Sequence, residues 1–159
     1  MTTSPPIVSL REITADTVIA IIRLSVSEAQ KGFVAPNAVS LAQALFAPEA
    51  WFRAIYCGDE PAGFVMLYDE SLRPEPPERP KIGVWRFMVD QRYQGRGIGR
   101  DALRQVIAQV RARGLFDTLE LSYVPGDGSP EAFYRSLGFQ STGRIDDGEV
   151  VLELRLEAA

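Results

Sequence analysis

The spacing of apolar residues along the chain predicts a mixed α/β fold. Short apolar runs between turn residues predict seven strands, over 7–13, 51–57, 62–68, 82–89, 118–123, 138–144 and 150–156. Apolar residues at helical spacing predict four helices: one carrying Val18, Ile19, Ile22 and Val26, one from Ser40 through Ala47, one over 98–113 and one opening at Ser129-Pro130. An antiparallel series followed by a β-α-β unit implies a mixed, mostly antiparallel sheet of six to seven strands with helices on both faces.

The ends of the helices follow from capping chemistry. Thr14 or Asp16 is expected to cap the first helix, and Ser40 the second, because short polar side chains accept the free N–H groups of a first turn. Gly114 is expected to end the long helix over 98–113. The proline-rich segment 70–81 is expected to be an exposed loop within one domain.

The composition narrows the chemistry. The chain has no histidine, which excludes Ser-His-Asp and Cys-His catalysis and the usual zinc sites, so we expect no metal. Its 21 acidic residues outnumber its 17 basic residues, which argues against nucleic-acid binding. No apolar run approaches the roughly 20 residues of a membrane span, and the N-terminus does not resemble a secretory signal, so we expect no membrane partner. The lone Cys57 is expected to be buried and inert, in a protein of the reducing cytoplasm.

The turn before the long helix carries the strongest chemical signal. Gly95, Gly97 and Gly99 alternate between an apolar strand and an amphipathic helix. Because glycines lack a Cβ, the backbone can approach a ligand closely here, and the N-terminus of a helix attracts anions. Arg96 and Arg100 add positive charge. A pyrophosphate is therefore the expected guest.

The sequence of this turn is compatible with four interpretations. It fits a glycine-rich connection without a ligand, a dinucleotide fingerprint, a P-loop or an acetyl-CoA pyrophosphate loop. A dinucleotide fold has G-x-G-x-x-G in an early βαβ unit, whereas the spacing here is G-x-G-x-G and late in the chain. A P-loop needs Gly-Lys-Ser/Thr, which is absent. The pattern favours the acetyl-CoA loop.

Two segments resemble signatures of the GNAT acetyltransferase superfamily. Residues 94–99 (QGRGIG) match Q/R-x-x-G-x-G/A, and 132–139 (AFYRSLGF) are similar to the family's helix-to-strand segment ending in Y-x-x-x-G-F. The stretches that resemble bacterial spermine/spermidine acetyltransferases of this superfamily are 33–44, 62–69, 85–99 and 125–139. The resemblance covers nearly the whole chain. It implies one domain over 1–159, acetyl-CoA as co-substrate and a homodimer.

The resemblance also implies site residues. An acetyl-CoA slot is expected where strand 82–89 splays from strand 118–123, and transfer is expected to be direct. The residues expected to bind acetyl-CoA are Phe87, Met88, Val89, Gln94, Gly95, Arg96, Gly97, Ile98, Gly99, Arg100 and Asp127. A backbone N–H near Val89 is expected to stabilise the oxyanion. Tyr134 is the expected general acid for the departing thiolate, although it also fits a tyrosine packed on the sheet, and Asp127 also fits a turn residue.

The resemblance leaves the general base open. Many relatives carry Glu in the strand that matches 82–89, but this chain has Trp85 and Arg86 and no carboxylate there. The candidate bases are Glu28, Asp69 and Glu70, and a chain of water molecules is the alternative.

The acceptor site is expected between the first-helix region and the hairpin loops. Its candidate residues are Glu28, Phe33, Asn37, Tyr68, Asp69, Glu70 and Trp85. Carboxylates suit the ammonium groups of a polyamine, and aromatic rings suit its methylenes and charges. We therefore expect a small-molecule amine, spermine or spermidine. The alternatives are another amine (an aminoglycoside, an amino acid or a protein N-terminus) or a non-catalytic acetyl-CoA sensor.

Overall fold

One seven-stranded sheet organises the computed structural model, which describes residues 6–156. The strand order is β1-β2-β3-β4-β5-β7-β6, and every neighbouring pair is antiparallel except β4 and β5. The strands are β1 (Val8–Arg11), β2 (Ala50–Cys57), β3 (Glu60–Asp69), β4 (Ile82–Val89), β5 (Thr118–Tyr123), β6 (Gln140–Asp146) and β7 (Glu149–Arg155). The predicted mixed, mostly antiparallel sheet is confirmed.

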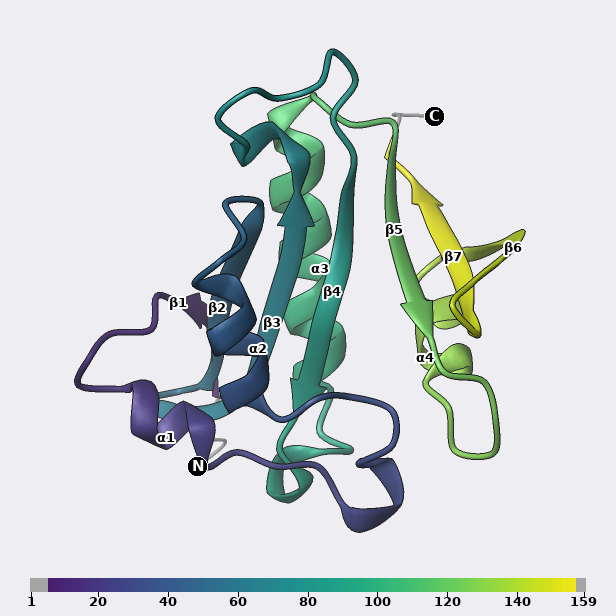
Figure 1. Ribbon diagram of the computed structural model, residues 1–159. Coiled ribbons are helices and arrows are strands. Elements are labelled where there is room, and N and C mark those ends of the chain that lie inside the picture. The colour runs from purple at the N-terminus through teal and green to yellow at the C-terminus, as the bar shows by residue number, and fades with distance from the viewer. Residues whose placement is uncertain (1–5, 157–159) are drawn as a thin grey trace.

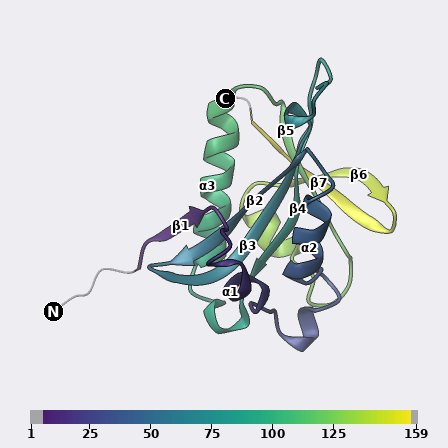
Figure 2. The same cartoon turned by 60° about the vertical axis from the view of Figure 1, so that its left-hand side comes forward.

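Helices cover both faces of this sheet, as predicted. They are α1 (Val18–Ile22), α2 (Asn37–Ala44), α3 (Ile98–Arg113) and α4 (Glu131–Ser136), with short 3-10 turns η1 (Glu28–Gln30), η2 (Glu70–Leu72) and η3 (Gln91–Tyr93). Figure 2 shows α3 and α2 on opposite sides of the sheet. The apolar face of α3, with Leu103 and Val106, packs in one core with Tyr134 and Phe139. A second core around Ile21 and Phe64 lies under α1 and α2.

The first two helices differ from their predicted form. The predicted helix around Val18 ends at Ile22, because Ser25 turns away and donates its backbone N–H to the Asp90 carboxylate at 2.9 Å. Ser40 does not cap α2, which begins at Asn37 after Pro36. The Ser40 side chain is instead fully buried, and its hydroxyl has no hydrogen-bond partner among the described residues.

Strands β4 and β5 pair over only part of their length. Hydrogen-bonded partners run from Ile82 with Leu119 to Val84 with Leu121. The register with β3 shifts next to Leu67, which leaves Trp85 as an extra residue in β4. Such a bulge bends a strand away from its neighbour. Beyond it the two strands diverge, and Figure 1 shows the gap between them widening, so the predicted splay is confirmed.

The absence of a side chain at Gly83 allows Tyr68 of β3 to reach across β4 to Glu120 of β5. Tyr68 of β3, Gly83 of β4 and Glu120 of β5 lie in one register row. A Cβ on Gly83 would overlap the Tyr68 ring, which crosses β4 at this point. The Tyr68 hydroxyl then reaches Glu120 and donates a hydrogen bond of 3.3 Å.

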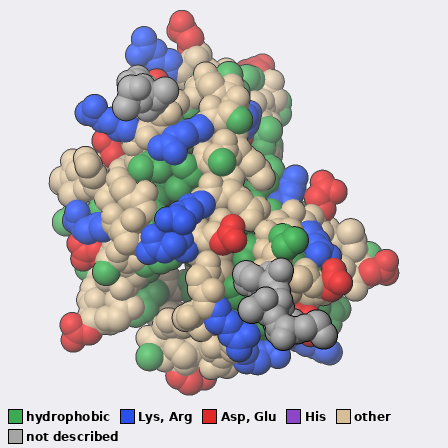
Figure 3. Space-filling view, turned by 180° about the vertical axis from the view of Figure 1, so that it is seen from behind, with side chains coloured by type: hydrophobic (Ala, Val, Ile, Leu, Met, Phe, Trp, Pro, Cys, Tyr) green, Lys and Arg blue, Asp and Glu red, His purple; other side chains and the backbone are tan. Residues whose placement is uncertain are grey.

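Basic side chains are scattered over the face behind the sheet. In Figure 3 the blue Lys or Arg side chains lie among neutral, hydrophobic and a few acidic ones. The exposed residues of α3 include Arg104 and Arg111. Among residues 6–156, no helix has the length and apolar character needed to cross a bilayer.

We expect Gly83→Ala to destabilise the protein by about 1–3 kcal/mol, the usual cost of overpacking. The added methyl displaces the Tyr68 ring and breaks its bond to Glu120. Urea unfolding measures the loss. Gly32→Ala is the matched control, since a Cβ there meets nothing within 4 Å. Equal stability of the two variants would contradict the contact.

Candidate active site

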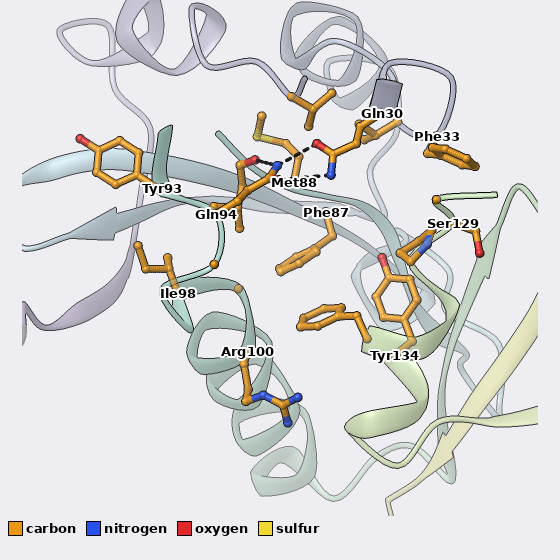
Figure 4. Close-up of a pocket in the computed structure, with 18 of the residues that line it drawn as sticks. Gln30, Phe33, Phe87, Met88, Tyr93, Gln94, Ile98, Arg100, Ser129 and Tyr134 are labelled. Carbon is orange, nitrogen blue, oxygen red and sulfur yellow. Dashed lines mark hydrogen bonds between the residues drawn. The ribbon is translucent and has the colours of Figure 1, made fainter. Parts of the chain in front are cut away.

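A cavity of about 450 Å³ lies at the wide end of the split between β4 and β5 (Figure 4). It is bounded by the end of β4, the N-terminus of α3, the start of α4 and the segment around η1. The lining residues are Val26, Gln30, Phe33, Val34, Phe87, Met88, Val89, Tyr93, Gln94, Gly95, Gly97, Ile98, Gly99, Arg100, Gly128, Ser129, Pro130, Phe133 and Tyr134. We call it the first cavity.

The glycine turn gives this cavity a wall whose geometry suits an anion. Gly95 and Gly97 both have φ of 79°, a conformation that other residues rarely adopt, and Gly97 is the N-cap of α3. A Cβ on Gly99 would lie 3.2 Å from the Val89 side chain, so glycine lets α3 begin close against β4. The N–H groups in the first turn of a helix have no intrahelical acceptor. Those of Ile98, Gly99 and Arg100 belong to residues that line the cavity, and such groups bind phosphates.

A pair of glutamines joins the two sides of the cavity mouth. The Gln94 side-chain amide donates to the Val89 carbonyl at 2.9 Å and to the Gln30 side chain at 2.9 Å. The Gln30 amide donates back to Gln94 at 3.2 Å. Gln30 was not predicted as a site residue, because only the fold brings the η1 segment against the glycine turn.

Asp90 fixes the base of the same turn. Its buried carboxylate accepts hydrogen bonds from the Ser25 N–H at 2.9 Å, the Arg92 N–H at 3.0 Å and the Arg92 Nε at 2.8 Å. Burial by itself would raise the pKa of Asp90, but these hydrogen bonds outweigh it and lower that pKa. The charged carboxylate thereby ties the end of β4 to the segment after α1.

Tyr134 provides a protonated hydroxyl at the cavity wall. Its ring is 7% exposed and packs against Phe133 and Phe139, with ring centroids 5.5 and 6.0 Å away. Figure 4 shows the hydroxyl directed into the cavity. Burial raises the pKa of this phenol, so it keeps its proton at neutral pH.

A second cavity, of about 510 Å³, lies on the adjoining stretch of β4. The first cavity is lined by Phe87–Val89, whereas the second is lined by Val84–Arg86. The other lining residues of the second cavity are Glu49, Tyr68, Glu70, Arg73, Glu120, Leu121, Ser122, Arg144, Asp146, Glu149 and Val151. Five of its residues are carboxylates and three are arginines, so the second cavity carries a net negative charge.

Most residues expected to bind acetyl-CoA line the first cavity. They are Phe87, Met88, Val89, Gln94, Gly95, Gly97, Ile98, Gly99 and Arg100, and Tyr134 joins them. Arg96 does not line the cavity but lies over the Tyr93 ring at 5.6 Å. Asp127 is exposed, and its neighbours Gly128 and Ser129 line the cavity in its place.

The expected acceptor residues are divided between several places. Tyr68, Glu70 and Trp85 line the second cavity. Phe33 instead lines the first cavity, where its ring is 3.9 Å from the Cβ position of Gly128. Asn37 lines neither, because its buried amide donates to the Ile21 carbonyl at 2.9 Å and supports the start of α2.

Two of the expected general bases are also outside both cavities. The Glu28 side chain is 88% exposed and pairs with Lys31 at 2.6 Å. Asp69 is buried, forms an ion pair with Arg113 and accepts hydrogen bonds from Ser71. Neither carboxylate therefore faces the first or the second cavity.

Comparison with known proteins identifies the class of protein. The model of the acetyltransferase (GNAT) family matches residues 20–139. The chain therefore belongs to the GNAT family of acetyltransferases, as the two sequence signatures indicated.

One relative in sequence and two solved structures illustrate this similarity. The spermine/spermidine N(1)-acetyltransferase of Bacillus subtilis is 30% identical over 149 residues, which are 91% of this chain and 96% of the relative. The ribosomal-protein-S18-alanine N-acetyltransferase of Escherichia coli has the same fold, with a TM-score of 0.67, 18% identity and 96% coverage of both chains. The PaiA N-acetyltransferase of Thermoplasma acidophilum, solved with coenzyme A, has a TM-score of 0.64 and 15% identity, covering 93% of this chain and 98% of that one.

We expect Asp90→Asn to destabilise the protein by about 1–3 kcal/mol at pH 7, because an amide NH₂ then faces N–H donors. The native pKa of Asp90 is lowered. The advantage of the wild type is therefore complete above the unfolded-state pKa of about 3.9 and declines as the pH falls through the lower native pKa. Urea unfolding of both proteins across this range tests the expectation. A stability difference that stays constant down to acid pH would contradict it.

Proposed function

We propose that this GNAT enzyme transfers the acetyl group of acetyl-CoA to a primary amine of a polyamine such as spermine or spermidine. One observation carries the proposal: an anion-binding cavity and a cavity rich in carboxylates adjoin along β4 where this strand separates from β5. The first suits the pyrophosphate of acetyl-CoA, and the second suits a polycation. The Bacillus subtilis relative, named a spermine/spermidine acetyltransferase, supports the choice of amine.

Acetyl-CoA fits the first cavity by two kinds of backbone contact. The N–H groups at the start of α3 bind its pyrophosphate, helped by the dipole of a 16-residue helix. Arg100, in the first turn of the same helix, also lines the cavity, and its guanidinium donates to the Ser136 hydroxyl of α4 at 2.7 Å. The edge of β4 from Trp85 to Val89 has no β5 partner. The amides of the pantetheine arm pair with this edge as an added strand would.

Acetyl transfer then proceeds directly from thioester to amine. The amine nitrogen attacks the carbonyl carbon, and a backbone N–H near Val89 stabilises the oxyanion. The carbon–sulfur bond breaks, and Tyr134 donates its proton to the thiolate. The nitrogen loses a proton as the amide forms, which restores the phenol. No acyl-enzyme is required, and the cavity residues need only position the two substrates.

The second cavity suits a flexible polycation. Its five carboxylates outnumber its three arginines, and this balance of charge attracts a cation. Trp85 and Tyr68 offer rings on which a methylene chain and its charges pack, at about 0.5–2 kcal/mol for each cation–π contact.

One observation favours a second candidate acceptor, an amino acid or a peptide N-terminus. Arg86 lines the same cavity, and its buried Nε has no hydrogen-bond partner among residues 6–156. Its terminal nitrogens donate to the Trp85 carbonyl at 3.0 Å and to Gln43 at 3.0 Å. The guanidinium of Arg86 would pair with the carboxylate of an amino-acid or peptide acceptor. A polyamine has no carboxylate.

We expect coenzyme A release to be concentrated on spermine and spermidine in a panel that also holds putrescine, lysine, an aminoglycoside and a peptide N-terminus. Steady-state thiol detection at neutral pH measures it. Turnover concentrated on lysine or the peptide would replace the polyamine with the second candidate. Binding of acetyl-CoA without turnover of any amine would indicate a sensor.

We expect Tyr134→Phe to lower kcat by roughly 10²–10⁴-fold, the usual contribution of a general acid. The affinity for acetyl-CoA should change little, because the cofactor is held by the glycine turn and the β4 edge. Tyr56→Phe is the control, since Tyr56 is also buried but lies in the other core. Unchanged kcat in Tyr134→Phe would show that water protonates the thiolate.

A further inference from the structure

Acetyl transfer to an ammonium needs a group that takes one proton before the attack. In β4, Trp85 and Arg86 occupy the stretch next to the split, so this strand offers no carboxylate. Glu28 and Asp69 line neither cavity. A side-chain base would therefore come from another element that borders the second cavity.

Four of the five carboxylates of the second cavity form ion pairs with arginines. Arg73 pairs with Glu49 at 3.8 Å and with Glu70 at 3.2 Å. Arg144 pairs in the same way with two further carboxylates, Glu120 at 3.4 Å and Asp146 at 3.2 Å.

Glu149 is the exception among these carboxylates. It makes no ion pair within residues 6–156, and its one side-chain hydrogen bond is with the Ser122 hydroxyl, which donates to it at 3.3 Å. We propose that Glu149 is the general base for the acceptor amine. This assignment rests on the proposed binding of an amine in the second cavity.

The position of Glu149 agrees with this role. It is the first residue of β7 and lines the second cavity together with Val151. Its partner Ser122 follows Leu121, the last residue of β5 that pairs with β4. The carboxylate thus lies beside the point where the two strands separate, which is where the two cavities adjoin. Glu149 is half-buried and Ser122 is exposed, so a proton taken here has a path to solvent.

The other charged groups of the second cavity leave Glu149 as its one carboxylate without an ion pair among the described residues. Arg86 of β4 faces the same cavity; burial lowers its pKa, and the negative charge of Glu149 acts against that shift. The other ionisable groups of the cavity come from β3, β5, β6 and the adjoining loops; they are Tyr68, Glu49, Glu70, Arg73, Glu120, Arg144 and Asp146. Most of these are already paired with one another, so the Glu149 carboxylate is the free partner for an incoming ammonium.

The proposed step balances as follows. One N–H proton of the ammonium moves to the Glu149 carboxylate, and the nitrogen lone pair becomes free. The amine attacks the thioester carbonyl, the carbon–sulfur bond breaks, and coenzyme A leaves with the proton of Tyr134. A second nitrogen proton, lost as the amide forms, returns to Tyr134. The proton on Glu149 passes to solvent, so each turnover releases one proton.

The test is Glu149→Gln, assayed over a range of pH with whichever amine of the panel the wild type acetylates fastest. We expect kcat to fall by roughly 10²–10⁴-fold at neutral pH. The defect should shrink as the pH rises, because the amine then arrives unprotonated. With hydroxylamine or trifluoroethylamine, which are largely unprotonated at neutral pH, the variant should approach the wild-type rate.

Glu153→Gln is the matched control, with the same substitution on the same strand at a half-buried residue that does not line the cavity. Acetyl-CoA affinity and the circular dichroism spectrum show whether each variant is folded. If Glu149→Gln raises KM but leaves kcat and the pH profile unchanged, the carboxylate only anchors the ammonium and the base assignment is overturned. An equal defect with protonated and unprotonated amines also overturns it.

The two proposals fail in different ways. If the wild type acetylates an amine that is not a polyamine, the proposed substrate is wrong and Glu149 is tested on that amine. If spermidine is acetylated and Glu149→Gln behaves like Glu153→Gln, only the base assignment is wrong. Turnover of no amine overturns both.

Discussion

The incomplete pairing of β4 with β5 is the constraint on which the rest of the structure depends. Only Ile82–Val84 find partners on β5, so the far half of β4 carries backbone N–H and C=O groups without a strand beside them. Such groups are costly to leave unsatisfied away from water. An extended ligand with amides of its own, as we propose for acetyl-CoA, would supply what the missing strand does not. The fold thus creates its cofactor slot by leaving a sheet unfinished, and no added domain is needed.

The start of α3 is held at the end of this slot by contacts that leave little freedom. Gly99 allows the helix to lie against Val89, and Gln94 binds the Val89 carbonyl. Asp90 ties the same corner to the segment after α1. The helix dipole and its free N–H groups therefore meet the end of β4, where a pyrophosphate would continue the line of an added strand. Substitutions in these supporting contacts should thus affect cofactor binding without touching the cofactor.

Local sequence signals predicted the parts of the fold that depend on local forces. The bounds of β4, α3 and β5 match the prediction residue for residue, because buried apolar runs and a terminal glycine determine them. The region from Ser25 to Gln30 was not predicted, because hydrogen bonds to Asp90 and Gln94 shape it from about 65 residues away in the sequence. The spacing of apolar residues along the chain gives no information about such distant partners.

The residues of the candidate site also divide into those that local sequence signals predict and those that depend on distant partners. The glycine turn and Tyr134 were predicted from motifs, since their roles depend on backbone shape and on one helix position. Asp69 is a candidate base from the sequence, but in the fold its side chain is oriented by an ion pair with Arg113 of α3. Glu149, which we propose as the base, was not predicted for the converse reason. Its value lies in having no ion pair among the described residues, and only the assembled cavity reveals that.

The arrangement of ion pairs also explains how a cavity with several carboxylates can bind a cation at one place. A paired carboxylate has already compensated for its lost hydration, and an ammonium that displaces Arg73 or Arg144 gains little. An unpaired one gains a charge-assisted hydrogen bond in full. The steepest gain for an amine is thus at Glu149, beside the split, whereas the paired groups serve as rigid walls for the rest of the chain. A long polyamine would then be held by its reacting end, so that placing the nitrogen against the thioester depends on Glu149 more than on the net charge of the cavity.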